Sequence, residues 1–293
     1  FGAGALNALS TSAVFNIFFF LMLVAFGASF AGARSLACMK HVGLNVASDP
    51  LYTFAYTGVN GGAVIVVADD PGLASSQNEQ DTRMVARSAH VPVLEPSDSQ
   101  EAKDFMKIAY EISEEYDTPV ILRTTTKLAH SQSAVELCDR VEVDDKEYSR
   151  NVAKYVMMPA SAIGRHVVVE DRENRLASDA YSLSVNRIEK GDNKIGFITS
   201  GIAYQYVKEV CPNASVLKLG LVNPLSKKLI EEFCNSVETV YVFEELEPVI
   251  EEQVRSWGYS VKGKELFTKQ GEYSANMLKN VLYGTSDVVF DKE

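Results

Sequence analysis

The densest set of polar side chains in the sequence directly follows its most apolar short segment. Residues 63–68 (AVIVVA) are small or β-branched, a turn sequence, DDPG, ends the run at residues 69–72, and the polar sequence SSQNEQD follows at residues 75–81. These side chains suit hydrogen bonding to a ligand better than packing. Because ligands in open α/β sheets bind beyond the carboxyl ends of the strands, we expect a binding site here. The alternative is a solvated loop that caps the next helix.

Three more side chains could contact a ligand at the same edge of the sheet. His41 and Asn45 lie in KHVGLN (residues 40–45), where we expect a tight polar turn, and Arg123 follows an apolar segment, residues 120–122. A lone histidine is more often a hydrogen-bonded structural residue than a ligand contact. Arg123 could pair with a ligand carboxylate or with the acidic helix before it, and the sequence favours neither.

A cluster of carboxylates ends a later segment of strand character. Glu244, Glu245 and Glu247 follow the residues TVYVF at 239–243. Paired carboxylates can act as acid and base, but no nucleophile or base partner is evident nearby. We therefore expect these three glutamates to serve surface or interface structure.

Cysteine and histidine spacings argue against a metal site or an iron–sulfur cluster held by this chain alone. The cysteines form no C-x-x-C pair and the histidines show no ligand spacing; they are Cys38, Cys138, Cys211, Cys234, His41, His90, His130 and His166. The sequence also has no G-x-G-x-x-G or Walker-type phosphate loop. Widely spaced cysteines are typical of reduced thiols, so we expect a cytoplasmic protein.

Length and charge limit the classes of function. The 293 residues are enough for two domains with separate cores. The net charge of −11 argues against nucleic acid or an anionic membrane surface as a partner, because either would need a basic surface.

Apolar periodicity predicts an α/β protein made of two doubly wound domains. We expect residues 64–67 to form an inner parallel strand, followed by a helix over residues 79–89 and short strands at 91–94 and 120–122. Residues 139–190 are charged and read as a connector with helical pieces. Strand and helix patterns then alternate again, with strands at 194–200, 215–219 and 239–243 and helices at 202–211 and 226–234.

The first 33 residues carry no charged side chain. Within them, residues 14–26 are almost wholly apolar, and we expect a helix buried on all sides, at a subunit or domain interface. A membrane span over residues 13–33 is the alternative, since about 20 residues suffice to cross a bilayer. No basic segment of the kind that begins a secretory signal is present. Residues 28–39 read as a second, small-residue helix.

Four long motifs resemble one enzyme family. They are MKHVGLNVASDPL (39–51), ADDPGLASSQNEQDTR (68–83), VLEPSDSQEAKDF (93–105) and TPVILRTTTKLAHS (118–131). From about residue 27 to its end, the chain resembles the N-terminal half of the α subunit of indolepyruvate ferredoxin oxidoreductases. These thiamine diphosphate enzymes oxidatively decarboxylate aryl 2-oxo acids to acyl-CoA and reduce ferredoxin through iron–sulfur clusters. The resemblance implies a pyrimidine-binding-type domain (1–165), a linker (166–190) and a smaller transketolase C-terminal-like domain (191–293).

The resemblance also implies roles for the polar residues already noted. Contacts to thiamine diphosphate are expected from Asp70, Ser75, Ser76, Gln77 and Asn78. Contacts to the 2-oxo acid are expected from His41, Asn45 and Arg123, and no catalytic or metal-binding residue is assigned.

The same resemblance implies cofactors and partners beyond this chain. The G-D-G…N motif that holds Mg²⁺ and the diphosphate is absent, as are the cysteine runs of a ferredoxin-like domain. We therefore expect the cofactor site to be shared with a domain outside this chain, and iron–sulfur clusters and CoA to enter only through such domains. A β subunit, ferredoxin and an oligomeric assembly are the expected partners.

One position departs from the family. Relatives carry an Asn-Glu pair that falls near Ile17 and Phe18 here, and that glutamate drives the proton relay on the cofactor. Phenylalanine cannot relay a proton. The rival hypothesis is therefore a non-catalytic assembly or regulatory module, and a third is a membrane-anchored α/β protein. The chain begins with Phe1 rather than Met, consistent with a fragment or an altered N-terminus.

Overall fold

The apolar run at residues 63–68 forms the inner strand of the first of two sheets. The computed structural model describes residues 2–148 and 150–284, with side chains from residue 17 onward. The strand order is β1-β2-β4-β3-β8, with β1 (Ser35–Lys40), β2 (Ala63–Asp69), β4 (Val120–Thr125), β3 (Val93–Leu94) and β8 (Leu221–Asn223). Parallel pairing joins β2 to β1 on one side and to β4 on the other. The predicted inner parallel strand is confirmed.

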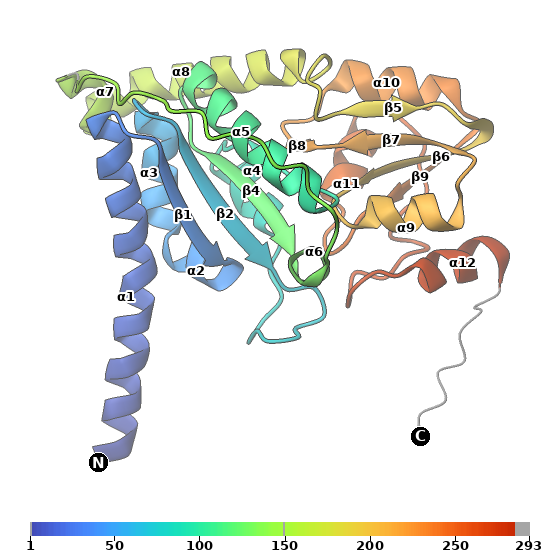
Figure 1. Ribbon diagram of the computed structural model, residues 1–293, viewed down its shortest axis with the longest axis horizontal. Helices are drawn as coiled ribbons and strands as arrows, with labels where there is room; N and C mark the ends of the chain where they lie inside the picture. The colour runs from blue at the N-terminus through green and yellow to red at the C-terminus, as the bar shows by residue number, and fades with distance from the viewer. Residues whose placement is uncertain (1, 149, 285–293) are drawn as a thin grey trace.

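Apolar side chains of β2 point alternately to the two faces of this sheet, and helices cover both faces. Ile65 and Val67 belong to one buried cluster, which also holds Phe54, while Val64 packs into another with Phe105. The first face is covered by α1 (Gly2–Ala31), α2 (His41–Val46), α3 (Ser48–Thr57) and α4 (Thr82–Ser88). The second face is covered by α5 (Ser99–Tyr116), visible in front of β4 in Figure 1. Both faces of β2 are therefore buried, as its continuous apolar sequence requires.

The second sheet is built in the same way. Its order is β5-β7-β6-β9, with β5 (Arg187–Glu189), β7 (Ala214–Leu219), β6 (Asp192–Ser200) and β9 (Thr239–Phe243). On β6, Phe197 faces the cluster of α9 (Ala203–Val210) and α12 (Ala275–Tyr283). The next residue, Ile198, faces α10 (Lys227–Ser236) and α11 (Val249–Ser256). The expected α/β fold with two wound sheets is confirmed.

A strand and a helix tie the two sheets together. The short β8 follows β7 in the chain but pairs antiparallel with β3 of the first sheet. The long α8 (Pro159–Asp179) runs along the top of Figure 1 from α7 (Val152–Tyr155) to the second sheet. Before it, after α6 (Thr126–His130), residues 131–148 are extended and largely exposed. One buried cluster contains residues of both sheets, including Val67 and Ile198.

Two local predictions near the N-terminus are wrong. Residues 28–39 do not form a helix, because α1 ends at Ala31 and Ser35–Lys40 is strand β1, paired with Ala63–Ala68. The predicted turn over residues 40–45 is instead the short helix α2. Small residues suit either state, and the pairing partner of β1 lies too far along the chain to be read from local pattern.

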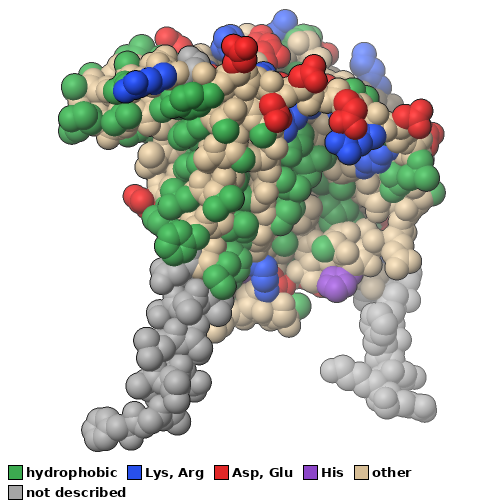
Figure 2. All heavy atoms as spheres, turned by 60° about the vertical axis from the view of Figure 1, so that its left-hand side comes forward, with side chains coloured by type: hydrophobic (Ala, Val, Ile, Leu, Met, Phe, Trp, Pro, Cys, Tyr) green, Lys and Arg blue, Asp and Glu red, His purple; other side chains and the backbone are tan. Residues whose placement is uncertain are grey.

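The apolar N-terminal segment is helical, but it buries only one face. Met22 and Phe26 of α1 are 0% and 6% exposed, whereas Phe20 and Val24 are 61% and 69% exposed. Within this chain the helix is therefore buried on one face only, and burial of its other face at an interface stays a prediction; the side chains of residues 14–16 lie outside the described part. Figure 2 shows hydrophobic side chains gathered in patches on this side of the molecule. Within the described residues, no helix combines the length and apolarity needed to cross a bilayer.

Candidate functional site

The polar loop lies at the carboxyl ends of β1, β2 and β4, as expected, and Asp70 determines its shape. The Asp70 carboxylate accepts hydrogen bonds from Ser75 N at 2.9 Å, Ser76 Oγ at 2.6 Å and Thr126 Oγ1 at 2.9 Å. Asp70 is 3% exposed. Burial alone would raise the pKa of this carboxyl, but the hydrogen bonds from Ser76, Ser75 and Thr126 hold it well below its usual range. Asp70 is thus ionised, and the hydrogen bonds to its carboxylate determine the conformation of the loop.

Side chains from β1 and α2 hold the outer part of the loop. Lys40 Nζ donates to Ser76 Oγ at 2.7 Å and to the Ser75 carbonyl at 3.0 Å. His41 Nε2 donates to the Asn78 carbonyl at 3.1 Å, and His41 is 2% exposed. Its Nδ1 has no hydrogen-bond partner among the residues that the structure describes. The structure therefore gives His41 a structural contact with the loop backbone.

Several of the predicted ligand residues remain open to solvent. Ser75, Gln77 and Asn78 are exposed, and Ser76 is half-buried. Asn45 Nδ2 donates weakly to Gln80 Oε1, at 3.4 Å, and Gln80 in turn donates to Asn78 Oδ1. The loop thus presents a row of amide and hydroxyl groups at the edge of the sheet.

Arg123 lies beneath the loop rather than on it. Its Nε donates to Asp69 Oδ2 at 2.6 Å and its Nη1 to Glu95 Oε1 at 2.5 Å. Asp69 also accepts from Thr82 N and Thr82 Oγ1, at the start of α4. Arg123 is 4% exposed. Its partners are Asp69 of β2 and Glu95, which follows β3, so the expected pairing with the acidic helix α5 is wrong, while contact with a ligand stays a prediction.

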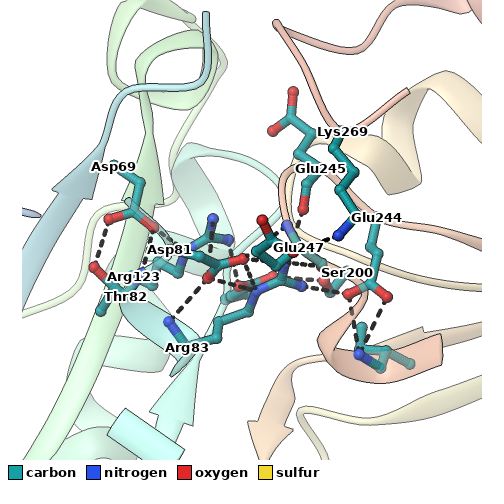
Figure 3. Close-up of polar contacts among 12 residues, drawn as sticks. Asp69, Asp81, Thr82, Arg83, Arg123, Ser200, Glu244, Glu245, Glu247 and Lys269 are labelled. Carbon is teal, nitrogen blue, oxygen red and sulfur yellow. Dashed lines mark hydrogen bonds and ion pairs between the residues drawn. The ribbon is translucent and has the colours of Figure 1, made fainter. Parts of the chain in front are cut away.

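A buried arginine, Arg83, links the polar loop to the second sheet. The sequence alone did not indicate this role. Arg83, on the first turn of α4, donates to Asp81 Oδ2 at 2.6 Å and to Glu244 Oε2 at 2.6 Å. Its Nη2 also donates to the carbonyls of Glu245 and Glu247. Figure 3 shows these side chains meeting between the two halves of the molecule. Glu244 and Glu245 are buried, so a surface position, one of the two roles expected for them, is wrong.

The electrostatics of this network follow from its burial. Burial raises the pKa of Asp69, Glu244 and Glu245, against the opposing effect of nearby cations and backbone donors. Burial also raises the pKa of Asp81, but the positive charges of Arg83 and Arg123 outweigh this effect and lower the pKa to about 2. Asp81 and Arg83 therefore form a charged pair inside the protein.

A small cavity remains inside the network. Its volume is about 10 Å³, and Arg123, Thr125, Ser200 and Glu245 are among the residues that line it. Arg123 Nη2 and Thr125 Oγ1 are buried and make no hydrogen bond within the described part of the chain. That volume is about the minimum that holds one water molecule, and it is far too small for a cofactor. The cavity inside the network is therefore not the place for such a ligand.

The loop presents polar groups to solvent, and its acidic side chains already accept hydrogen bonds: Glu79 Oε1 accepts one from Gly72 N at 2.7 Å. Both Asp70 oxygens are occupied by hydrogen bonds from the loop and from Thr126. Among the described residues, no group of three or more histidine, cysteine or acidic side chains could hold a metal ion.

Comparison of the sequence with known proteins points to one family. Residues 21–191 match the family described as "Pyruvate flavodoxin/ferredoxin oxidoreductase, thiamine diP-bdg". Over 260 residues the chain is 44% identical to indolepyruvate oxidoreductase subunit IorA of Pyrococcus horikoshii, covering 83% of this chain and 40% of that protein. The Archaeoglobus fulgidus protein of the same name is 41% identical over 256 residues, 85% of this chain and 40% of its own length. The chain therefore spans about two fifths of these curated relatives.

Solved structures share the fold at low sequence identity. A 2-oxoglutarate:ferredoxin oxidoreductase from Magnetococcus marinus, with 2-oxoglutarate, coenzyme A and succinyl-CoA bound, aligns with a TM-score of 0.68 and 15% identity, covering 88% of this chain and 54% of that one. A split-gene transketolase, an inactive β4 tetramer, aligns with a TM-score of 0.54 and 16% identity over 84% of this chain and 69% of that one. Both likenesses concern the arrangement of the two sheets.

Proposed function

Because the chain belongs to the pyruvate flavodoxin/ferredoxin oxidoreductase family, we propose that it is the thiamine-binding part of a 2-oxo acid oxidoreductase. The substrate is an aryl 2-oxo acid such as indolepyruvate, the product an acyl-CoA, and the electron acceptor ferredoxin. The observation that carries this proposal is the ordered polar loop at the carboxyl edge of the first sheet, inside the residues that match the family. The names of the curated relatives support the choice of substrate.

The loop residues suit the pyrimidine ring of thiamine diphosphate. An aminopyrimidine presents both donors and acceptors, and Ser75, Gln77 and Asn78 offer both kinds of group from exposed positions. Asp70 and Ser76 would act indirectly, because the 2.6 Å hydrogen bond between their side chains fixes the conformation of the loop. When bound, the cofactor supplies the carbanion that attacks a 2-oxo acid; this chain's residues bind and orient its ring.

The substrate contacts are proposed on the same edge. Asn45 has a side-chain amide near Gln80, at the rim of the loop. His41 contributes by holding the Asn78 carbonyl in place. Arg123 contributes through Asp69, whose carboxylate it binds at 2.6 Å beneath the loop. We assign no catalytic residue to this chain.

The rest of the machinery is proposed to come from outside these residues. Mg²⁺ and the diphosphate would be held by another domain, and iron–sulfur clusters and CoA by further domains. A β subunit and ferredoxin are the proposed partners, in an oligomer in the cytoplasm. The exposed apolar face of α1, with Phe20 and Val24, supports a covered position in that assembly. We keep 1–165, 166–190 and 191–293 as the proposed domain division.

One observation favours a second candidate, a non-catalytic assembly module. The family's relay glutamate is expected near Phe18, three residues before the matched segment begins. Phe18 packs against Gly43 of α2 so closely that an added Cβ at Gly43 would lie 2.9 Å from its ring. An apolar ring at that point offers no proton path.

A chimera tests the enzymatic proposal for residues 27–284. Residues 27–284 would replace the corresponding region of the P. horikoshii relative, with the relative's own N-terminal segment and partner subunit retained. We expect thiamine-dependent oxidation of indolepyruvate, with Gln77→Ala raising the thiamine diphosphate concentration needed for half-maximal rate. A folded, assembled chimera without activity would contradict the enzymatic proposal.

The Phe18 question needs a second pair of chimeras. One carries residues 17–284 with Phe18, and the other carries Phe18→Glu. A rate lower by about 10²–10⁴ with Phe18 is the usual effect of losing one positioned acid–base group. Equal rates in the two chimeras would show that the proton path does not pass through residue 18.

A further inference from the structure

An open pocket of about 370 Å³ lies far from the polar loop. Its walls come from α8, from the start of α10 and from the end of α11, and they include Ser178, Ser226, Lys227, Gln253 and Trp257. In Figure 1, α8 and α10 lie at the top, whereas β1, β2 and β4 point their carboxyl ends toward the bottom. The volume falls within the range of small-molecule sites, and the proposed function makes no use of this pocket.

The N-terminus of α10 is uncapped where it meets the pocket. Ser226 occupies the N-cap position, but its side chain makes no capping hydrogen bond. Ser226 is 3% exposed, and its hydroxyl makes no hydrogen bond with any described residue. The first backbone N–H groups of a helix have no carbonyl partner within the helix. The hydroxyl of this largely buried serine and several backbone N–H donors are therefore available at the pocket wall.

Two lysines add positive charge at the same place. Lys227 and Lys228 are both exposed and open the first turn of α10. Lys227 has no ion-pair partner among the described residues, and Lys228 Nζ lies 3.9 Å from the centre of the Tyr181 ring. Cations at a helix N-terminus are unfavourable for the helix dipole, which is itself positive there. Glu231 and Glu232 follow one turn later on α10, so the positive charge is confined to the first turn of the helix.

An anion with a phosphate group would satisfy these groups together. Helix N-termini bind phosphate through free N–H groups, and serine and lysine side chains commonly complete such sites. Glu173 also lines the pocket, but its carboxylate is bound by His90 Nδ1 at 2.6 Å. Trp257, half-buried against the core, supplies an aromatic wall.

We propose that this pocket binds an organic phosphate. The phosphate lies at the N-terminus of α10, in contact with Ser226, Lys227 and Lys228, and a flat ring of the ligand packs against Trp257. Stacking on tryptophan and charge-assisted hydrogen bonds to phosphate are independent contributions, so both parts of the ligand are needed for full affinity.

Trp257 is the only tryptophan of the chain, so its fluorescence reports on the pocket directly. The chain would be titrated with ADP, adenosine and inorganic phosphate, with calorimetry as a second readout. We expect saturable ADP binding with a change in Trp257 emission, displacement of ADP by inorganic phosphate, and no adenosine binding at the same concentrations. If calorimetry detects no saturable ADP binding, the proposal is wrong.

Variants locate the phosphate. The double change Lys227→Ala and Lys228→Ala should weaken ADP binding by about tenfold or more, since charge-assisted hydrogen bonds are lost. Ser226→Ala should weaken it less, and Lys194→Ala, an exposed lysine on β6, should leave it unchanged. ADP affinity equal in the double variant and in Lys194→Ala would overturn the assignment. Equal binding of adenosine and ADP would overturn it too.

Discussion

Arg83 Nη1 lies 2.6 Å from Glu244 Oε2, although the two residues are 161 positions apart in the chain. The same guanidinium also binds Asp81, at the end of the polar loop. A single side chain therefore connects the loop at the first sheet to the turn after β9 in the second. Movement of the second sheet relative to the first would have to break these contacts, so the second half of the chain helps to fix the proposed cofactor loop.

Replacement of Arg83 should be strongly destabilising. Arg83→Ala would leave Asp81 and Glu244 buried without their main cation, and such a loss typically lowers the free energy of unfolding by about 3–5 kcal/mol. Urea unfolding followed by circular dichroism measures it. Arg140→Ala is the matched control, because the Arg140–Glu142 pair is 82% and 76% exposed. A loss for Arg83→Ala no larger than for the control would show that the buried network is not stabilising.

The Glu114 carboxylate should make stability depend on pH in the acid range. Hydrogen bonds from Arg34, at 2.8 Å, and from Gly62 N, at 3.1 Å, lower the pKa of Glu114 to about 2, against burial. Because this pKa lies below the usual 4.5, the stabilisation is fully present above about pH 4.5 and is lost as the pH falls toward 2.

Glu114→Gln removes that titration, so the variant should lose less stability than the parent between pH 5 and pH 3 when urea midpoints are compared. Glu115→Gln, an exposed neighbour on α5, should follow the parent. Parallel pH profiles for the parent and Glu114→Gln would contradict the argument.

Two glycines should respond to alanine in opposite directions. An added Cβ at Gly61 would lie 2.2 Å from the Ala33 carbonyl oxygen, a backbone atom, so Gly61→Ala should lower stability by about 1–3 kcal/mol. At Gly164, inside α8, the same Cβ would meet no atom within 4 Å. Gly164→Ala should raise stability by about 0.5–1 kcal/mol. Thermal unfolding of both variants checks the pair, and two shifts of the same sign would refute it.

Thiamine diphosphate should bind this chain only weakly by itself. The exposed loop offers amide and hydroxyl groups, but the chain has no motif for Mg²⁺ and the diphosphate, and the described residues include no metal-binding cluster. Calorimetry with thiamine diphosphate and Mg²⁺ should therefore detect no micromolar binding. Micromolar affinity would mean that a diphosphate site exists within these 293 residues.

Local sequence was enough to predict most of the strands. The apolar run before Asp69 predicts an inner strand because both faces of β2 are buried, and the polar loop follows at the expected edge. Strands β6, β7 and β9 were found in the same way, since alternate side chains meet two different helix layers. Strand β1 was missed because Leu36, Met39 and Lys40 are good helix formers and because its pairing partner, β2, lies farther along the chain.

Long-range contacts account for what the sequence did not reveal at the site. The role of Arg83 depends on Glu244 and on two carbonyls of the second half, and no spacing along the chain indicates such a meeting. Arg123 was expected to meet a ligand or the acidic helix α5, whereas it binds Asp69 and Glu95. Single titratable residues suggest chemistry by their type, but their partners are set by tertiary packing.

The pairing of β8 with β3 has a consequence for how the protein is made. Proteins emerge from the ribosome N-terminus first, and a domain can fold only when its last strand is available. The first sheet needs Leu221–Asn223 to complete its edge, so a nascent chain ending at residue 165 would still expose the backbone of β3. Until translation passes residue 223, that open edge could pair with other extended chains, and we expect nascent-chain chaperones to bind during this interval.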